Sequence, residues 1–425
     1  MKLLVIGSGG REHALAWKLA KTPGLQRVCV APGNAGTARE HELENVNLTD
    51  TAALADFAEQ NGIHLTVVGP EAPLAAGVVD LFRARGLKIF GPTQAAAQLE
   101  SSKDFAKRFM TRHKIPTAAF ETFADPRAAH AYVEARGAPI VIKADGLAAG
   151  KGVVVAMHLD EAHAAIDDML SGNKLGDAGA RVVIEDFLDG EEASFIVMVD
   201  GKNVLPLASS QDHKRLLDGD RGPNTGGMGA YSPAPCVTPE IHAKAMREII
   251  LPTVRGMAAD GMPYTGFLYA GLMIGKDGSV KTLEFNCRMG DPETQPIMMR
   301  LKSDLLDLLE HAVAGTLDQV EAEWDRRVAL GVVLAAANYP EKPRTGDGIQ
   351  GLPPGNSFGE DAHVFHAGTT YVDGQVVTAG GRVLCVTALG ENVKLAQKRA
   401  YEALSEIHFE GMQYRKDIGH RAISR

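Results

Sequence analysis

Short apolar runs alternate with helical patterns through the first hundred residues of the chain. The runs Leu3–Ile6, Arg27–Ala31, Leu65–Gly69 and Lys88–Gly91 predict strands, with helical segments between them. Strands that alternate with helices are typical of a parallel sheet whose two faces are covered. Residues 1–100 are therefore expected to form an N-terminal, Rossmann-like parallel-sheet domain that binds a substrate at the carboxyl ends of its strands.

The rhythm changes after Gly91-Pro92, where helices begin to combine with antiparallel hairpins. One hairpin joins Gly266–Ile274 to Ser279–Asn286 through a turn at Lys276-Asp277-Gly278. We expect a central α+β region over residues 101–325, with a flap subdomain at about 118–190 and the remainder over 191–325. Residues 326–425 predict a small C-terminal α+β domain, so the fold class is α/β overall.

The sequence also predicts the structure of three further segments. The periodicity predicts one helix over Leu74–Arg85 and another over Thr294–Ala314. The stretch from Gln211 to Pro233 has neither helical nor strand period, which is typical of a functional loop or a disordered insertion. Its segment Asp212-His213-Lys214-Arg215 combines charge with nearby glycines and suits a cover over a polar substrate. For His213 a hydrogen-bonding role is favoured over that of a general base.

Composition restricts the classes of function. A chain of 425 residues predicts two to four domains. The net charge of −9 is unfavourable for binding duplex nucleic acid, which requires an excess of Lys and Arg. No apolar run approaches the ~18 residues of a membrane span. The four cysteines are scattered, which is typical of a reducing compartment. We therefore expect a cytoplasmic protein with no nucleic-acid or membrane partner.

A glycine-rich turn, Gly7-Ser8-Gly9-Gly10-Arg11-Glu12, follows the first predicted strand and begins a helix. Glycines let the backbone approach an anion, and a helix N-terminus offers free N–H groups. A dinucleotide-binding turn would have a third glycine at Glu12 and an acidic residue at the end of the second strand, and neither is present. A single phosphate held by Gly9, Gly10 and Arg11 is the preferred interpretation; the alternative is a tight turn that needs glycine only for packing.

A second glycine-rich turn, Asp145–Gly152, joins two predicted strands. It is not a P-loop, because three residues separate its glycines and no Ser or Thr follows Lys151. A strand–loop–strand unit of this kind can close over a triphosphate, with Lys143 adding a point charge. The alternative is a hairpin that is flexible and has no ligand.

The segment Leu283–Arg288 alternates polar and apolar side chains, so Glu284, Asn286 and Arg288 share one face of a strand. A carboxylate and an amide oxygen two residues apart are hard ligands of the kind that Mg²⁺ prefers. Arg288 can form paired hydrogen bonds with a carboxylate or phosphate. The alternative is an edge strand with a solvated polar face.

Several of these segments together resemble one family. Lys143 with the Asp145–Gly152 flap, Glu185–Leu188 and Glu284–Asn286 resemble the nucleotide site of the ATP-grasp carboxylate–amine ligases. The closer resemblance is to the glycinamide ribonucleotide synthetases of purine biosynthesis, and it extends from Met1 to Leu384. It rests on Gly7–Ala14, Pro32–Gly36, Gly69–Leu74, Lys143–Gly152, Gln211–Arg215, Gly222–Gly229 and Asn286–Glu293.

This resemblance implies an ATP-dependent ligase. The family joins glycine to 5-phosphoribosylamine through a glycyl phosphate intermediate, giving glycinamide ribonucleotide, ADP and phosphate. The acyl phosphate is the activated species, so catalysis would come from positioning and charge neutralisation. The implied cofactor is Mg²⁺ or Mn²⁺, and the implied substrates are ATP, glycine and 5-phosphoribosylamine. Whether the enzyme that supplies the amine makes a transient contact with this chain is left open by the sequence.

The resemblance also implies roles for individual residues. The expected ATP contacts are Lys103, Lys143, Gly150, Lys151 and Gly152 at the phosphates, Glu185, Asp186, Phe187 and Leu188 at the adenine, and Glu191 at the ribose. Glu284 and Asn286 are expected to hold the metal, Arg288 and Asp212 to flank glycine, and these two with Lys143 to carry catalysis. The expected contacts of 5-phosphoribosylamine are Gly9, Gly10, Arg11, Glu12, Asn34 and Glu71.

One departure and three alternatives remain open from the sequence. Many ATP-grasp sites have another carboxylate on the preceding strand, but Phe267–Ile274 contains no Asp or Glu, which favours coordination by phosphates and water. Another ATP-grasp enzyme, such as a biotin carboxylase-like or formyl-phosphate-forming ligase, would share the nucleotide half. A nucleotide-binding regulatory protein and a Rossmann oxidoreductase are the other two alternatives.

Overall fold

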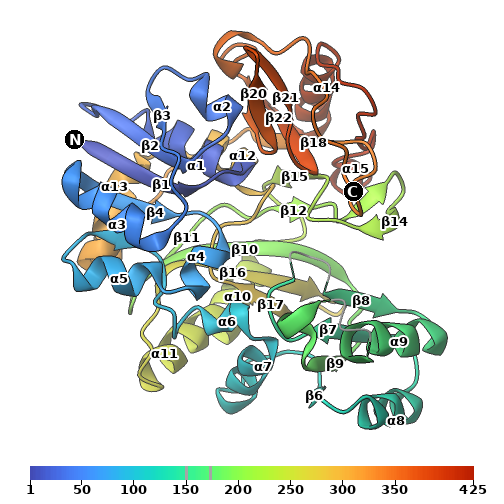
Figure 1. The fold of residues 1–425 in the computed structure, drawn as a ribbon. Helices are drawn as coiled ribbons and strands as arrows, with labels where there is room; N and C mark the ends of the chain where they lie inside the picture. The colour runs from blue at the N-terminus through green and yellow to red at the C-terminus, as the bar shows by residue number, and fades with distance from the viewer. Residues whose placement is uncertain (149–151, 172–174) are drawn as a thin grey trace.

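The computed structural model describes residues 1–148, 152–171 and 175–425 (Figure 1). The N-terminal sheet is parallel, with strand order β3-β2-β1-β4-β5, as the alternating pattern predicted. Its strands are β1 (Lys2–Gly7), β2 (Arg27–Pro32), β3 (Leu43–Asn45), β4 (Ile63–Val68) and β5 (Ile89–Phe90). Its helices are α1 (Gly10–Leu19), α2 (Ala35–Ala38), α3 (Thr51–Gln60), α4 (Glu71–Ala75) and α5 (Val78–Ala84). The short elements α2 and β3 were not predicted.

The flap subdomain is a four-stranded sheet with the order β6-β9-β7-β8. It contains β6 (Phe120–Phe123), β7 (Ile140–Ala144), β8 (Val153–Ala156), β9 (Val182–Asp186), α8 (Pro126–Arg136), α9 (Leu159–Ile166) and the short helices η1 (Asp167–Ser171) and η2 (Gly176–Gly179). Side chains of α8 and α9 form one apolar core with the sheet. In Figure 1 this unit lies at the lower right, away from the N-terminal and C-terminal sheets. It is preceded by α6 (Gln98–Ser101) and α7 (Lys103–Arg112).

The central sheet has the strand order β11-β10-β16-β17, and every pair is antiparallel. Its strands are β10 (Glu191–Asp200), β11 (Val204–Pro206), β16 (Thr265–Ile274) and β17 (Val280–Asn286). Alternate residues of β10 contribute to two different cores, because Phe195 and Val197 face one side while Ile196 and Met198 face the other. The first core includes the helical stretch α10 (Pro239–Ala245), η3 (Met246–Ile250) and α11 (Leu251–Ala259); the second includes α12 (Thr294–Arg300) and α13 (Leu305–Ala314).

The C-terminal sheet has the order β12-β15-β18-β22-β19. Its strands β18 (Val328–Ala335), β19 (Ala362–His366) and β22 (Arg382–Gly390) are joined by β12 (Gln211–Asp212) and β15 (Gly229–Ser232). Nearby elements are η4 (Leu317–Gln319), η5 (Pro354–Asn356), β13 (Arg215–Leu217), β14 (Arg221–Asn224), β20 (Thr369–Val372), β21 (Gln375–Thr378), α14 (Val393–Leu404) and α15 (His420–Ile423). The prediction of a stretch without regular structure over Gln211–Pro233 is therefore wrong.

Two predicted helices are each divided in two. The helix expected over Leu74–Arg85 is interrupted at Gly77, whose φ of 89° lies in the left-handed region that helices do not use. The helix expected over Thr294–Ala314 stops at Leu301, which is extended, and restarts at Asp304, whose side chain accepts a hydrogen bond from Leu306 N–H. No helix among the described residues is both long and apolar enough to cross a membrane.

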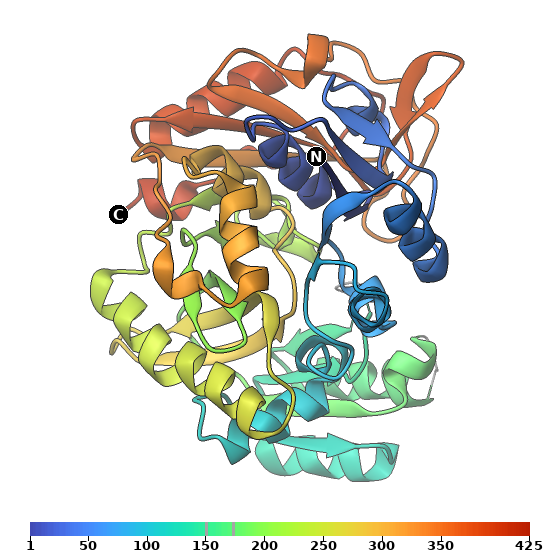
Figure 2. The ribbon, with the colours of Figure 1, turned by 90° about the vertical axis from the view of Figure 1, so that its left-hand side faces the viewer.

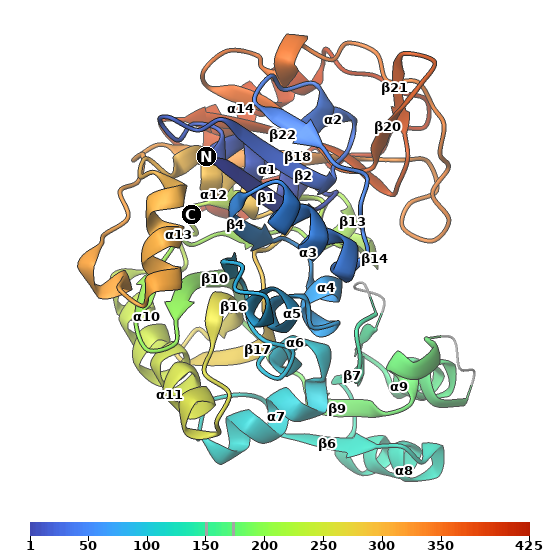
Figure 3. The ribbon, with the colours of Figure 1, turned by 60° about the vertical axis from the view of Figure 1, so that its left-hand side comes forward.

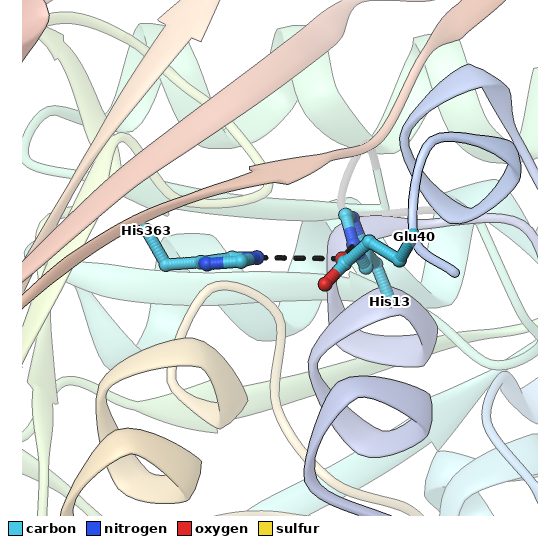
Figure 4. A group of neighbouring side chains, drawn as sticks. All are labelled: His13, Glu40 and His363. Atoms are coloured by element: carbon cyan, nitrogen blue, oxygen red, sulfur yellow. Dashed lines mark hydrogen bonds and ion pairs between the residues drawn. The ribbon is translucent and has the colours of Figure 1, made fainter. Parts of the chain in front are cut away.

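The N-terminal and C-terminal sheets lie side by side (Figures 2 and 3). Their contact includes a polar cluster in which Glu40 binds His13 of α1 and lies 3.3 Å from Nε2 of His363 on β19 (Figure 4). The ring of His13 also packs edge-on against Phe365. Domains that are distant in the sequence are thus joined by buried polar and aromatic contacts.

Candidate active site

A cavity of about 770 Å³ opens between the flap, the central sheet and the N-terminal and C-terminal domains. Its walls include most of the residues that the sequence singled out. From the expected ATP and metal sites it is lined by Lys103, Lys143, Gly152, Glu185, Asp186, Phe187, Leu188, Glu191, Glu284 and Asn286. From the expected substrate sites it is lined by Arg11, Glu71, Asp212 and Arg288. The fold thus brings residues of the flap sheet, the central sheet, the C-terminal sheet and the helices α1, α4 and α7 to one space.

Lys143 lies on β7 at the floor of this cavity, with 6% of its surface exposed. Its ammonium lies 2.7 Å from Oε1 of Glu185 and donates to the Leu283 carbonyl at 3.2 Å. Burial lowers the pKa of Lys143, but Glu185 and Glu284 outweigh that effect and raise it. The lysine is therefore a fixed positive charge in the cavity.

A second buried lysine, Lys107, was not predicted as a site residue. Its ammonium lies 3.0 Å from Oε2 of Glu185 and donates to Thr117 Oγ1 at 2.7 Å and to the Ala118 carbonyl at 3.0 Å. Lys107 follows Lys103 by one turn of α7, so both ammonium groups reach the cavity. The four-residue spacing of the two lysines, which places side chains on one face of a helix, was the available sequence signal.

The flap contacts the N-terminal end of α7. Ser102, the N-cap of α7, donates to Asp145 at 3.1 Å, and the ammonium of Lys103 donates to the Gly146 carbonyl at 3.3 Å. At Gly152 there is little space for a side chain, since an added Cβ would lie 2.8 Å from that of Ala148. The expected phosphate contacts Gly150 and Lys151 lie outside the described residues.

The segment from Glu185 to Leu188, with Glu191, forms one wall of the cavity. The carboxylate of Asp186 forms a 2.5 Å ion pair with Arg136, and both side chains are partly exposed. The carboxylate of Glu191 forms an ion pair with Arg425 near the C-terminus.

Glu284 and Asn286 lie on the cavity face of β17, as the alternation predicted. Among the described residues, no hydrogen bond or ion pair reaches the Glu284 carboxylate at contact distance. Burial would raise the pKa of Glu284, but Lys214, Lys143 and Lys103 hold it below its usual value. An ionised carboxylate and an amide oxygen facing one space are a donor set that fits a divalent cation.

Arg288 is the third residue of that face and connects the central region to the N-terminal domain. Its Nη2 donates to Glu100 at 2.8 Å and to Asn286 Oδ1 at 3.4 Å, and its Nε lies 3.3 Å from Glu71. Glu100, which was not predicted, holds the guanidinium from behind. These contacts fix the guanidinium at the boundary between the expected metal site and the N-terminal domain.

Asp212 faces the cavity from β12, and the pKa of its carboxyl group is strongly raised. Burial, together with the carboxylates of Glu293 and Glu192, raises the pKa of Asp212 to about 7, although Lys214 opposes that rise. Lys214 itself lies 3.4 Å from Glu192. A carboxylate that titrates near neutrality is common where a charged ligand is bound.

The N-terminus of α1 is already occupied by carboxylates of the protein. Gly9 N–H donates to Glu12 at 2.9 Å, and Arg11 N–H donates to Asp291 Oδ2 at 3.2 Å. The Glu12 side chain also fills the space beside Gly7 and Gly69, where a Cβ would collide with it. Of the turn Gly9–Glu12, Arg11 reaches the cavity wall, together with Asp291 and Glu71.

Asn34 does not line the cavity, because its side chain is used within the protein. Its Oδ1 accepts from Gly36 N–H and Thr37 N–H at the start of α2, and its Nδ2 donates to the Ser8 and His366 carbonyls. All four hydrogen-bonding positions of the amide are therefore filled. In the described fold Asn34 fixes the turn before α2 next to the C-terminal domain.

The trio His13, Glu40 and His363 has ligand atoms within 4.8 Å of one another, which is the spacing of a metal site (Figure 4). His13 Nδ1, however, accepts a hydrogen bond from His366 N–H at 2.8 Å. The proton of a neutral ring must then be on Nε2, where it points at Glu40, whereas a metal would need the lone pair of that nitrogen. The trio is better explained as a contact between domains.

Comparison with known proteins gives matches along almost the whole chain. Family models described as the N domain, the ATP-grasp (A) domain and the C domain of phosphoribosylglycinamide synthetase match residues 1–100, 101–294 and 329–421. The chain belongs to the phosphoribosylglycinamide synthetase family.

Relatives named phosphoribosylamine–glycine ligase extend this assignment. Those of Ralstonia nicotianae and of Neisseria meningitidis serogroup A are 70% and 69% identical, and each match covers all of both chains. The solved phosphoribosylamine–glycine ligase of Thermotoga maritima superposes with a TM-score of 0.85 at 37% identity, covering 98% of this chain and all of that one. The synthetase family thus accounts for the whole length of the chain.

More distant structures share the fold. The biotin carboxylase of Campylobacter jejuni, solved as a β-γ-ATP complex, superposes with a TM-score of 0.75 at 14% identity, covering all of this chain and 95% of that one. The predicted fold class, with a parallel N-terminal sheet and ATP-grasp domains, is confirmed. Several residues that line the cavity of this synthetase-family member were not predicted from the sequence: Glu100, Lys107, Asp291, Glu293, Arg382 and Arg421.

Proposed function

We propose that this protein joins glycine to 5-phosphoribosylamine, converting ATP to ADP and phosphate and producing glycinamide ribonucleotide for purine biosynthesis. The observation that carries the proposal is that buried lysines, a carboxylate without a contact partner among the described residues, and a fixed arginine meet in one cavity. Family membership over the full length supports the same activity.

The reaction has two steps, phosphorylation of glycine and formation of the amide bond. A carboxylate oxygen of glycine attacks the γ-phosphorus of ATP, so that glycyl phosphate forms and ADP leaves. The amine of 5-phosphoribosylamine then attacks the acyl carbon, forms the amide bond and expels phosphate, and the amine gives up a proton. Neither step needs a nucleophile from the protein, so orientation and charge neutralisation supply the catalysis.

The nucleotide would lie between the flap and the central sheet. Lys103 and Lys143, with Gly150, Lys151 and Gly152 of the flap, would neutralise its phosphates, and the wall from Glu185 to Leu188 would contact the adenine. Glu191 would bind the ribose hydroxyls after releasing Arg425. Glu284 and Asn286 would hold Mg²⁺ or Mn²⁺, which would neutralise phosphate charge when bound.

Glycine would lie between Arg288 and Asp212. The guanidinium of Arg288 matches the geometry of a carboxylate, and the acid of Asp212 suits the ammonium group. Both residues line the cavity: Asp212 lies on β12, and Arg288 follows the end of β17 by two residues. With Lys143, they form the proposed catalytic set.

The ribosylamine would bind toward the N-terminal domain. Arg11 and Glu71 line this end of the cavity, while Gly9, Gly10, Glu12 and Asn34 shape the turns behind them. Because Asp291 and Glu12 occupy the N-terminus of α1, we place the ribose and amine, rather than the phosphate, beside this turn.

The proposal includes a cellular setting. The amine substrate would reach the open cavity from the enzyme that makes it, through solution or a transient contact. The thiols of Cys29, Cys236, Cys287 and Cys385 are all buried and unpaired, which supports a reducing compartment, the cytoplasm.

The proposal is tested by measuring the formation of ADP from ATP by the purified protein. With ATP and Mg²⁺, we expect sustained ADP formation when both glycine and 5-phosphoribosylamine are present. Formation of ADP that depends on bicarbonate would favour a biotin carboxylase-like enzyme. Nucleotide binding without turnover would favour a regulatory protein.

A further inference from the structure

The segment from Asp212 to Gly226 forms one wall of the cavity but has little apolar core of its own. Asp212, Lys214, Arg215, Asp220 and the stretch 224–226 all line the cavity. Its two-stranded sheet, β13 with β14, is mostly exposed, and Leu217 is half-exposed. Asp212 pairs with Ala230 of β15 in the C-terminal sheet, but the rest of the segment needs another support.

That support comes from the C-terminal segment. Arg415 is completely buried and pairs with Asp417 through two hydrogen bonds, from Nε and Nη2, each 2.8 Å long. Its Nη1 donates to Asp220 Oδ1 at 2.9 Å and to the Arg215 carbonyl at 3.3 Å. One guanidinium thus connects the C-terminal segment to the side chain and the backbone of the cavity wall.

Backbone hydrogen bonds reinforce the connection in both directions. Gly219 N–H donates to Asp417 Oδ2 at 2.9 Å, and Lys416 N–H donates to Asp218 Oδ1 at 2.8 Å. Arg421 binds the second oxygen of Asp220 at 2.8 Å. The two segments are almost 200 residues apart in sequence but form one hydrogen-bonded unit.

His213 sets the direction of the neighbouring side chains. It is fully buried, and its Nε2 accepts a hydrogen bond from Gly419 N–H at 3.1 Å. Extended residues alternate sides, so a His213 that points into the C-terminal segment leaves Asp212 and Lys214 on the cavity side. Burial and the charges of Arg421 and Arg415 lower the pKa of His213 to about 3, so the ring is a neutral acceptor.

We propose that Arg415 is a positioning residue of the active site, which holds the segment from Asp212 to Asp220 so that Asp212 and Lys214 face the substrates. The inference rests on the proposed function for its link to glycine. It gives the C-terminal domain a role in the first half-reaction, although Arg415 itself does not line the cavity.

The test compares Arg415→Met and Arg415→Lys with Arg344→Met as a matched control. Arg344 also belongs to the C-terminal domain and pairs with an aspartate, Asp347, at 2.8 Å, but it is exposed. Hydrogen exchange is followed at the amides of His213 and Met228, which are bonded to the Gly229 and His213 carbonyls. KM values for glycine and for ATP are measured in parallel with those of Asp212→Asn.

In Arg415→Met we expect both amides to exchange at least about tenfold faster and the KM for glycine to rise about tenfold, with the KM for ATP within about twofold of wild type. Arg415→Lys should recover part of both effects, and Arg344→Met should change neither. If Arg415→Met does not fold, Asp417→Asn takes its place with the same expectations.

Unchanged exchange, or a KM for ATP that rises as much as that for glycine, would overturn the inference. So would faster exchange with an unchanged KM for glycine while Asp212→Asn raises it. If the exchange rate rises but neither variant alters the KM for glycine, the positioning of the segment stands and the proposed contact of Asp212 with glycine fails.

Discussion

Lys107 and Lys143 bind opposite oxygens of one buried carboxylate, that of Glu185, at 3.0 and 2.7 Å. A buried carboxylate shared by two ammonium groups leaves a net positive charge inside the cavity. Lys143 is therefore held in place by a partner that does not have to leave when phosphate arrives, because Lys107 continues to balance Glu185.

Lys107→Met should raise the KM for ATP by about tenfold, because Glu185 then draws Lys143 away from the phosphates. Lys107→Arg, which keeps the charge, is the control and should lie close to wild type. Steady-state kinetics with ATP and glycine varied separately are the measurement. Equal rises in the two KM values would contradict a role confined to the nucleotide.

Arg288→Lys should raise the KM for glycine by about tenfold and leave that for ATP nearly unchanged, because lysine keeps the charge but lacks the planar pair of parallel N–H groups that matches a carboxylate. Lysine also avoids leaving the carboxylate of Glu100 buried without a cation. Arg108→Lys on the exposed face of α7 serves as control. A normal KM for glycine in Arg288→Lys would remove the proposed contact.

Glu284→Gln should increase the Mg²⁺ concentration needed for half-maximal activity by at least about tenfold, since it replaces the charged ligand by a neutral one. The exposed Glu121→Gln on β6 is the matched control. Metal titration at saturating ATP is the measurement. An unaltered titration curve would place the metal elsewhere.

The KM for glycine should fall as the pH rises. The pKa of Asp212 is raised by burial to about 7, so its carboxylate is neutral below that pH and ionised above it. Only the ionised form attracts the ammonium of glycine, which predicts a decrease of about tenfold in KM between about pH 6 and about pH 8. In Asp212→Asn the KM should be higher and independent of pH over this range; a retained pH dependence would assign it to another group.

The contact between the N-terminal and C-terminal domains should increase the free energy of unfolding at neutral pH and contribute less at acidic pH. Burial would raise the pKa of Glu40, but its hydrogen bonds with His13 and His363 hold it well below its usual 4.5. A depressed carboxyl pKa stabilises the fold above the unfolded value, and this stabilisation is lost as the pH falls. Glu40→Gln should therefore lower the free energy of unfolding by about 1–3 kcal/mol at neutral pH, with a smaller loss at acidic pH.

Denaturant unfolding at several pH values measures this difference. Glu42→Gln, at an exposed position two residues away, should have no effect. A loss of stability in Glu40→Gln that is the same at all pH values would show that Glu40 is not ionised in the fold.

The fold was predictable where burial imposes a local pattern. The strands β1, β2 and β4 are covered on both faces, so their sequences are continuous apolar runs. The strands β12 and β15 have only two and four residues. β12 pairs with β15, and β15 pairs with β18, about a hundred residues later, so no local period identifies them. The break at Gly77 depends on one backbone angle, which periodicity does not detect.

The same distinction applies to the site. Glu284, Asn286 and Arg288 follow from strand alternation, and Lys107 could have been found from its helical spacing to Lys103. Arg415 and Glu100 act through partners almost 200 residues away, which only the folded chain brings together. Asn34 belongs to a matching motif, but its amide is used to cap α2.

Transfer of oxygen from glycine to phosphate tests the central claim most directly. Glycine labelled with ¹⁸O in both carboxylate oxygens is incubated with the protein, ATP, Mg²⁺ and 5-phosphoribosylamine, and the released phosphate is analysed by mass spectrometry. Because glycyl phosphate carries one carboxylate oxygen to phosphorus, the account predicts one ¹⁸O atom in each phosphate released during amide formation. Phosphate without the label would contradict it.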